Sequence, residues 1–319
     1  MNPEQEQFRS SLHSLLAASD VPSIARAWAA GSCEPGLAMW RKLADLGVTA
    51  LAIPAEYDGL EATATDLVIA FEELGHHAVP GPAIESVAVV PSLILSRLPE
   101  TAADPAVARA SDVASLASQW LPRFASGETL ATLAWPPHQP FAVDAHIAAL
   151  PFGGTPGETV ASVDPTRHLS HIESEHFIGG RNDRAFDLGA LACAAQLTGL
   201  GQAMLDLSVA YVQQRVQFGQ PVGKFQAVKH HLADVRIALD FARPLVYSAA
   251  ESLAPQDISA AKVAASAAAQ LAARSGLQVH GAIAYTREYD FSLWLVKARA
   301  LLPAWGTASW HRNRLLESL

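Results

Sequence analysis

Hydrophobic residues recur every three or four positions in two segments near the N-terminus, which is the spacing of one face of a helix. In the stretch GLAMWRKLADLGV this face carries Leu37, Trp40, Leu43 and Leu46. In the stretch TATDLVIAFEELGHH it carries Leu67, Phe71 and Leu74. Gly47 and Gly75 follow the two patterns as natural helix stops. We therefore expect an N-terminal helical domain over residues 1–125.

The pattern changes between residues 126 and 180. Short apolar runs, TLATLAW, HIAALPF and TVASV, alternate with turn-forming stretches, PPHQP, GGTPGE and DPT. Such runs divided by Pro and Gly are typical of strands joined by turns. The segment has room for a few strands only, so it predicts a small, reduced β domain.

From Asp187 onward the helical period returns and continues to the end of the chain. One long amphipathic helix is indicated by apolar residues at Phe225, Val228, Leu232, Val235 and Leu239. Pro244 should kink or end this helix. The alanine-rich stretch ISAAKVAASAAAQLAARSG predicts a second helix whose small side chains allow close helix packing. Residues 181–319 are therefore expected to form a C-terminal helical bundle, and the fold class is mainly α with a small β unit.

The uncharged stretch between Asp187 and Asp206 has about the minimum length for crossing a bilayer. It is rich in Ala and Gly and contains Gln196, Thr198 and Gln202. A helix buried inside a bundle explains this composition better than a membrane span, so no membrane partner is expected.

Composition narrows the function classes. The chain has 319 residues, 50% of them hydrophobic, which suffices for a sizeable core. Its net charge of −9, without a cluster of Lys or Arg, argues against nucleic acid as a partner. The two cysteines, Cys33 and Cys193, are far apart in the chain and indicate a reducing compartment. The N-terminus is polar and has no signal-peptide pattern, so we expect a cytoplasmic protein.

Three motifs carry a resemblance to a known family. The stretch YVQQRVQFGQPVGKFQAVKHHLADV places Arg215 at a helix end, a turn after it, and a second helix opening at Gln226. This stretch, together with QVHGAIAYTREY (residues 278–289) and LAIPAEYDGL near the N-terminus, resembles the acyl-CoA dehydrogenase family. The resemblance implies an N-terminal helical domain, a middle β domain and a C-terminal four-helix bundle.

The resemblance also implies FAD held at subunit interfaces. By position, Arg215 would pair with the FAD pyrophosphate, and Phe218 and Gln226 would line the same ADP half. Gln278 and Gly281 would receive adenine and phosphate from the cofactor of a neighbouring chain. The residue types suit these roles, because Arg makes fork-shaped, charge-assisted contacts to phosphate and glycine lets backbone approach closely.

Two departures from the family concern the catalytic base. The family reaction needs a carboxylate that removes an α-proton from the acyl-CoA. Most members carry this glutamate before a C-terminal Gly-Thr, where this chain has Trp305, and indole can only donate a hydrogen bond. Other members carry it at the start of the first bundle helix, where this chain has Gly189 followed by Ala190. We therefore expect no catalytic residue in this chain.

The middle domain also departs from the family. Neither the Thr-Glu-Pro…Gly-Ser-Asp loop nor the Lys-x-Trp-Ile-Thr strand that hold the flavin ring can be found there. In the C-terminal stretch QVHGAIAYTREY, Ala282 and Ala284 stand where the family usually has glycine. The chain thus looks like the shorter subunit of a two-subunit acyl-CoA dehydrogenase of actinobacterial steroid side-chain degradation, which VDPTRHL also resembles. This implies FAD shared with a longer partner subunit, an α2β2 assembly, and the acyl-CoA substrate bound on the partner.

Two alternatives remain open at this point. The chain could be a self-sufficient dehydrogenase with a relocated base, Glu288 or Asp290, or an FAD-free scaffold. No metal site is expected: His230 and His231 are adjacent and diverge by about 100° on a helix. His168, His171 and His176 lack Cys or carboxylates at ligand spacing.

Overall fold

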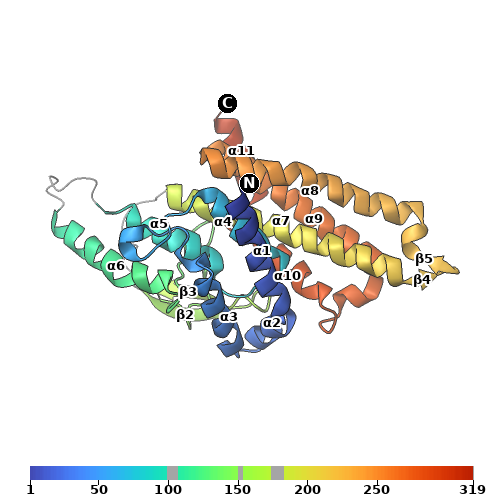
Figure 1. The fold of residues 1–319 in the computed structure, drawn as a ribbon, viewed down its shortest axis with the longest axis horizontal. Helices are drawn as coiled ribbons and strands as arrows, with labels where there is room; N and C mark the ends of the chain where they lie inside the picture. The colour runs from blue at the N-terminus through green and yellow to red at the C-terminus, as the bar shows by residue number, and fades with distance from the viewer. Residues whose placement is uncertain (99–106, 150–153, 174–182, 319) are drawn as a thin grey trace.

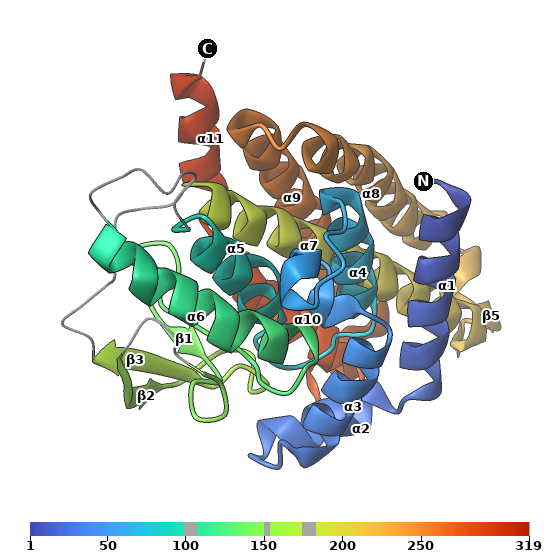
Figure 2. The same ribbon diagram turned by 60° about the vertical axis from the view of Figure 1, so that its left-hand side comes forward.

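The computed structural model describes residues 1–98, 107–149, 154–173 and 183–318. Helices dominate the described residues, with a small sheet on one side of the molecule, next to α6 (Figures 1 and 2). This confirms the predicted fold class. The helices of the N-terminal part are α1 (Pro3–Ala18), α2 (Val21–Ala29), α3 (Glu34–Asp45), α4 (Ala64–His76), α5 (Val90–Leu95) and α6 (Val107–Ala125).

Local signals explain where these helices begin and end. A capping box opens α1, where Asn2 and Gln5 exchange side-chain and backbone hydrogen bonds. Thr63 and Asp66 do the same for α4. After α3, Gly47 takes a left-handed conformation with a φ of 81°, as expected of a helix stop.

Gly75 does not end α4, as the sequence had suggested, because the helix continues to His76. Its role is close packing against α7 (Asp183–Gln214). A Cβ atom on Gly75 would lie 2.2 Å from the Gln196 carbonyl oxygen, and one on Gly199 would lie 1.9 Å from the Glu72 carbonyl oxygen. Two glycines that face each other's helix thus bring the α4 and α7 backbones into contact.

The small sheet contains β1 (Ala142–Val143), β2 (Thr155–Val160) and β3 (Leu169–Glu173) in the antiparallel order β1-β3-β2. Ser170 pairs with both Ala142 and Thr159, so β3 lies in the centre.

The predicted strands were largely wrong. TVASV overlaps β2 only at its first two residues, and HIAALPF extends beyond the described residues. TLATLAW forms a loop with isolated bridges at Ala131 and Trp135. Most of its apolar residues are buried, but its backbone bonds to side chains and loops: Ser86 both donates to and accepts from Ala131. Burial alone therefore produced the strand-like pattern.

The C-terminal part is a helical bundle in which α7, α8 (Gln226–Ser252) and α9 (Pro255–His280) lie side by side (Figure 1). Two short strands, β4 (Val216–Gln217) and β5 (Gln220–Pro221), form a hairpin between α7 and α8. Helices α10 (Phe291–Leu301) and α11 (Ala308–Glu317) complete the chain. Pro244 does not end α8, which continues to Ser252.

The apolar helix α7 is the core of this bundle. It is long and apolar enough to cross a membrane by length and composition, but 89% of its most apolar window is buried inside the protein. At its N-terminal end Asp187 forms a two-pronged ion pair with Arg314 of α11, including an Nη2–Oδ2 contact of 2.9 Å. The predicted buried bundle helix is therefore what the structure shows.

Candidate functional site

The five residues that the sequence assigned to FAD lie at one end of the bundle. Arg215 follows the end of α7, Phe218 lies in the β4–β5 turn, and Gln226 opens α8. Helix α9 returns to the same end, because the Tyr211 hydroxyl donates to the His280 carbonyl oxygen over 3.4 Å. Gln278 and Gly281 belong to this end of α9 and the turn after it. The structure thus brings together residues more than sixty positions apart in the sequence.

All five residues are exposed. Phe218 is 90% exposed in a left-handed conformation, and Arg215, Gln226, Gln278 and Gly281 are exposed as well. The Arg215 guanidinium has no ion-pair partner within the described ranges. Gly281 has a φ of 70° and nothing within 4 Å of where a Cβ atom would stand. A free cation, an open glycine and an exposed ring can meet a phosphate-linked aromatic ligand, but they do not enclose it.

His280 is a residue of this end that the sequence analysis missed. Its ring stacks between Tyr211 and Phe291, with ring centroids 4.4 Å from each. Its Nδ1–H donates to the Gly276 carbonyl oxygen over 2.8 Å. Burial lowers the pKa of His280, against a smaller opposing effect of that hydrogen bond. A neutral, stacked ring therefore fixes the turn that presents Gly281 to the end of α7.

The second region of interest surrounds Trp305, which is 0% exposed and left-handed at φ 57°. Its carbonyl oxygen accepts a hydrogen bond from Nε2 of His311 over 2.9 Å. Its ring lies 5.9 Å from that of Phe186 and 6.3 Å from that of Trp135. An aromatic cluster therefore holds the indole inside the protein.

Trp305 and Gly189, at which the sequence resemblance would place the family's base, meet in space. A Cβ atom on Gly189 would lie 2.7 Å from Cε3 of the Trp305 indole. This distance is too short for a side chain at residue 189 unless the indole moves. Ala190 next to it is fully buried. The indole fits at this place because residue 189 has no side chain, and neither position offers a carboxylate.

A buried acid, Glu85, lies near this indole and was also missed. It belongs to the π-helical turn Ile84–Val89 that leads into α5, and it is 1% exposed. Burial raises the pKa of Glu85, and the positive charge of Arg167 opposes this shift. The Trp305 indole also lowers the pKa of Glu85 slightly. Neither Glu85 Oε1 nor Trp305 Nε1 has a hydrogen-bond partner among the described residues. The Glu85 carboxyl is thus enclosed beside the Trp305 indole.

The acids considered as relocated bases lie elsewhere. Asp290 forms an ion pair with Arg26 of α2, whose guanidinium also donates to the Glu288 carbonyl oxygen over 3.3 Å. Both acids precede α10, whereas Trp305 follows its end. The 11 residues of α10 rise about 16 Å, so these carboxylates are remote from the indole.

A groove of about 960 Å³ lies between the β unit and the helices α9, α10 and α11. None of the residues that line it is Asp or Glu, and its charged residues are Arg167, Arg299 and Arg312. Its histidine, His138, packs against the Trp310 ring at 4.3 Å. The groove therefore offers positive charge but no carboxylate base.

The histidines noted in the β unit do not share one site. Nδ1 of His168 lies 2.7 Å from the Asp144 carboxylate, whereas the His171 ring packs edge-on against Phe141. His176 lies outside the described residues.

Comparisons with known proteins extend these observations. Residues 2–128 match the family "Acyl-CoA dehydrogenase, N-terminal domain", and residues 182–319 match "Acyl-CoA dehydrogenase, C-terminal domain". Neither match includes residues 129–181. The acyl-CoA dehydrogenase IpdE2 of Mycobacterium tuberculosis is 31% identical over 307 residues, covering 92% of this chain and 91% of IpdE2.

Solved structures share the fold. A glutaryl-coenzyme A dehydrogenase superimposes with a TM-score of 0.80 at 18% identity, covering 99% of this chain and 95% of that chain. A chain of the ChsE4-ChsE5 complex of Mycobacterium tuberculosis gives 0.79 at 19% identity, covering 100% of this chain and 97% of that one. The resemblance seen in the motifs is thus confirmed over nearly the full length, and the chain belongs to the acyl-CoA dehydrogenase family.

Proposed function

We propose that this chain is the shorter subunit of a heteromeric acyl-CoA dehydrogenase, in which it completes the FAD site of a longer partner and supplies no catalytic base. Members of the family use FAD, which accepts hydride when it is bound. The observation that carries the proposal is the pairing of Trp305 with Gly189, because the indole fills the place where a base would stand.

The distance between the two regions supports a shared cofactor. Gly189 lies near the start of α7 and Arg215 just beyond its end, so the helix separates them by roughly 40 Å. An extended FAD is much shorter than this. The residues around Arg215 would therefore bind the ADP half of a cofactor whose flavin ring another chain holds.

The contribution of this end of the bundle would be binding and orientation. The Arg215 guanidinium would make charge-assisted hydrogen bonds to the pyrophosphate. Phe218 and Gln226 would line the ADP half, and Gln278 with the open backbone at Gly281 would receive adenine and phosphate. The acyl-CoA substrate and its base would belong to the partner.

An exposed apolar stripe on α8 supports assembly with another chain. Ile237, Phe241 and Leu245 are spaced by four residues and are 54%, 75% and 43% exposed. Contiguous exposed apolar residues of this kind are typical of interaction surfaces. Proteins of similar fold point the same way, since ChsE4-ChsE5 is a complex and Tcur3481-Tcur3483 is a steroid acyl-CoA dehydrogenase. We propose an α2β2 assembly in the cytoplasm that acts on a steroid-derived acyl-CoA.

Substitution of Arg215 tests this role. In the complex with the longer chain, Arg215→Ala should weaken FAD binding by about 1.5–3 kcal/mol, the range for hydrogen bonds to charged groups. This corresponds to a roughly tenfold to hundredfold weaker affinity for FAD. The variant complex should therefore lose FAD on dilution while its two chains stay assembled. FAD release can be followed by flavin fluorescence and assembly by size-exclusion chromatography.

Arg236→Ala is a matched control. Arg236 is an exposed arginine further along α8, where its Nε donates to Asp240 over 2.9 Å. This variant should retain FAD like the wild type. Equal FAD retention in the Arg215→Ala complex would contradict the proposed phosphate contact.

A further inference from the structure

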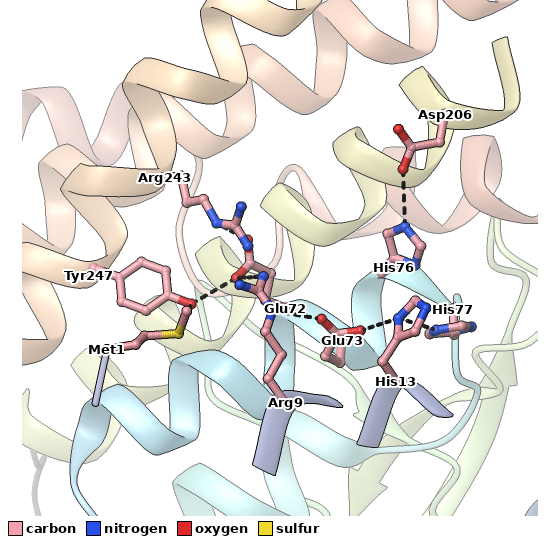
Figure 3. Close-up of polar contacts among 10 residues, drawn as sticks. All are labelled: Met1, Arg9, His13, Glu72, Glu73, His76, His77, Asp206, Arg243 and Tyr247. Carbon is pink, nitrogen blue, oxygen red and sulfur yellow. Dashed lines mark hydrogen bonds and ion pairs between the residues drawn. The ribbon is translucent and has the colours of Figure 1, made fainter. Parts of the chain in front are cut away.

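Three histidine rings and a buried carboxylate meet where α1 packs against the end of α4 (Figure 3). His13 comes from α1, Glu73 and His76 from the last turns of α4, and His77 from the residue after it. The ring centroids lie 4.9, 5.0 and 5.6 Å apart. This cluster, called here the His3Glu cluster, shares no residue with the proposed FAD site.

The donor atoms of the cluster converge. His13 Nδ1 lies 2.9 Å from Glu73 Oε2 and 3.3 Å from His77 Nε2. One ligand atom from each of the four residues lies within 4.8 Å of the other three. In a tetrahedral zinc site with Zn–N distances of about 2.0–2.1 Å, neighbouring ligand atoms are about 3.3 Å apart. The cluster is thus close to the size of such a site.

The outer contacts of the cluster orient its donors. Nε2 of His76 lies 3.3 Å from the Asp206 carboxylate, and this carboxylate also accepts from Gln202 Nε2 over 2.8 Å. Glu73 Oε1 accepts from Arg9 Nε over 3.0 Å, which leaves Oε2 facing the histidines. Outer hydrogen bonds of this kind, present here for His76 and Glu73, are the usual support of a metal site.

Hydrogen bonds alone leave this cluster incompletely satisfied. His76 Nδ1 is buried and has no hydrogen-bond partner. A proton on His13 Nδ1 would have to serve both Glu73 and His77. A bound cation would satisfy all of these nitrogens at once, since neutral imidazole is the form that binds metal.

We propose that His13, Glu73, His76 and His77 form a binding site for a divalent transition metal ion, with Zn²⁺ as the best match to three imidazoles and one carboxylate. With four protein ligands the site has no open position, so it is structural. It would tie α1 to the end of α4. This departs from the expectation from sequence, which considered only histidines close together in the chain.

Zinc titration of the untagged, EDTA-treated chain tests the proposal. Isothermal titration calorimetry with ZnCl2 should show one Zn²⁺ per chain, and the melting temperature should rise with zinc because only the folded state forms the site. Co²⁺ in place of Zn²⁺ should give the visible absorption of a tetrahedral site. His13→Gln and His77→Gln should each lower zinc affinity at least tenfold.

A matched control separates this site from ordinary surface histidines. His230 and His231 are both exposed on α8, so the double variant His230→Gln/His231→Gln should bind zinc like the wild type. His13 is half-exposed, so His13→Gln should fold, and its metal-free melting temperature verifies this. Absence of stoichiometric zinc binding, or equal affinity in His13→Gln and wild type, would overturn the proposal.

Discussion

At the scale of single residues, the Trp305 side chain fills the interior between α7 and the end of α10. It is fully enclosed and packs against the bare backbone of Gly189. Trp305→Ala should lower the free energy of unfolding by about 3–5 kcal/mol through the cavity it leaves. Trp305→Glu should also destabilise, because an unpaired carboxylate would replace the ring. Chemical unfolding of the purified variants measures both effects.

Neither substitution should change catalysis per assembled complex. A carboxylate at residue 305 would have no flavin ring beside it, so Trp305→Glu should not raise the turnover per FAD. Acyl-CoA oxidation assays on assembled complexes give this number. If Trp305→Glu raised it, or if Trp305→Ala abolished it in an assembled complex, this region would be catalytic.

His311, which holds the Trp305 carbonyl, makes the fold sensitive to acid. Burial lowers its pKa from 6.5 to about 4, despite the hydrogen bond to Trp305. The neutral ring therefore contributes stability that is present above pH 6.5 and is lost as the pH falls towards 4. In the wild type, this effect lowers the free energy of unfolding by about 2 kcal/mol between about pH 7 and 5. His311→Gln should lack this part of the decrease. Urea unfolding at the two pH values measures this difference, and an unchanged decrease would contradict it.

At the scale of elements, the crossing of α4 and α7 depends on two glycines. Gly199→Ala would place a methyl group 1.9 Å from the Glu72 carbonyl oxygen, which belongs to rigid helix backbone. We expect a loss of about 1–3 kcal/mol or more, as for other overpacked sites. Gly201→Ala is the control, because its nearest contact is the flexible end of the Leu239 side chain at 2.8 Å. Thermal unfolding should show a larger loss for Gly199→Ala, and equal losses would contradict this account.

The same elements show what a sequence can predict. The helical period located α3, α4 and α8, because one face of each helix repeats with its turn, and the alanine-rich composition located α9. The strands were misplaced because TLATLAW is buried as a loop, with Ser86 satisfying part of its backbone. An apolar run indicates burial, but it forms a strand only where the backbone of a neighbouring strand pairs with it.

Sites that depend on contacts between distant segments were the least predictable. Arg215 and Gly281 could be named because each belongs to a motif of its own. The contact between Trp305 and Gly189, and the meeting of His13 with His76 and His77, join helices far apart in the chain. Their spacing in the sequence carries no signal of either contact.

At the scale of the whole molecule, the two regions to which we assign a functional meaning lie near opposite ends of α7. The residues proposed to bind the ADP half lie at one end of the bundle, and Trp305 with Gly189 lies near the other end of α7, roughly 40 Å away. The apolar stripe around Phe241 is exposed on α8. On these grounds we propose that the chain needs a second, longer chain to hold and use the flavin.

The flavin content of the purified chain tests this account most directly. The chain should be purified alone and after co-expression with the longer acyl-CoA dehydrogenase chain of the same organism. FAD per chain is then measured by absorbance, and the assembly by native mass spectrometry. The account predicts little or no FAD on the chain alone, and one FAD per pair of unlike chains in the complex. A yellow homo-oligomer of this chain that oxidises acyl-CoA without a partner would contradict it.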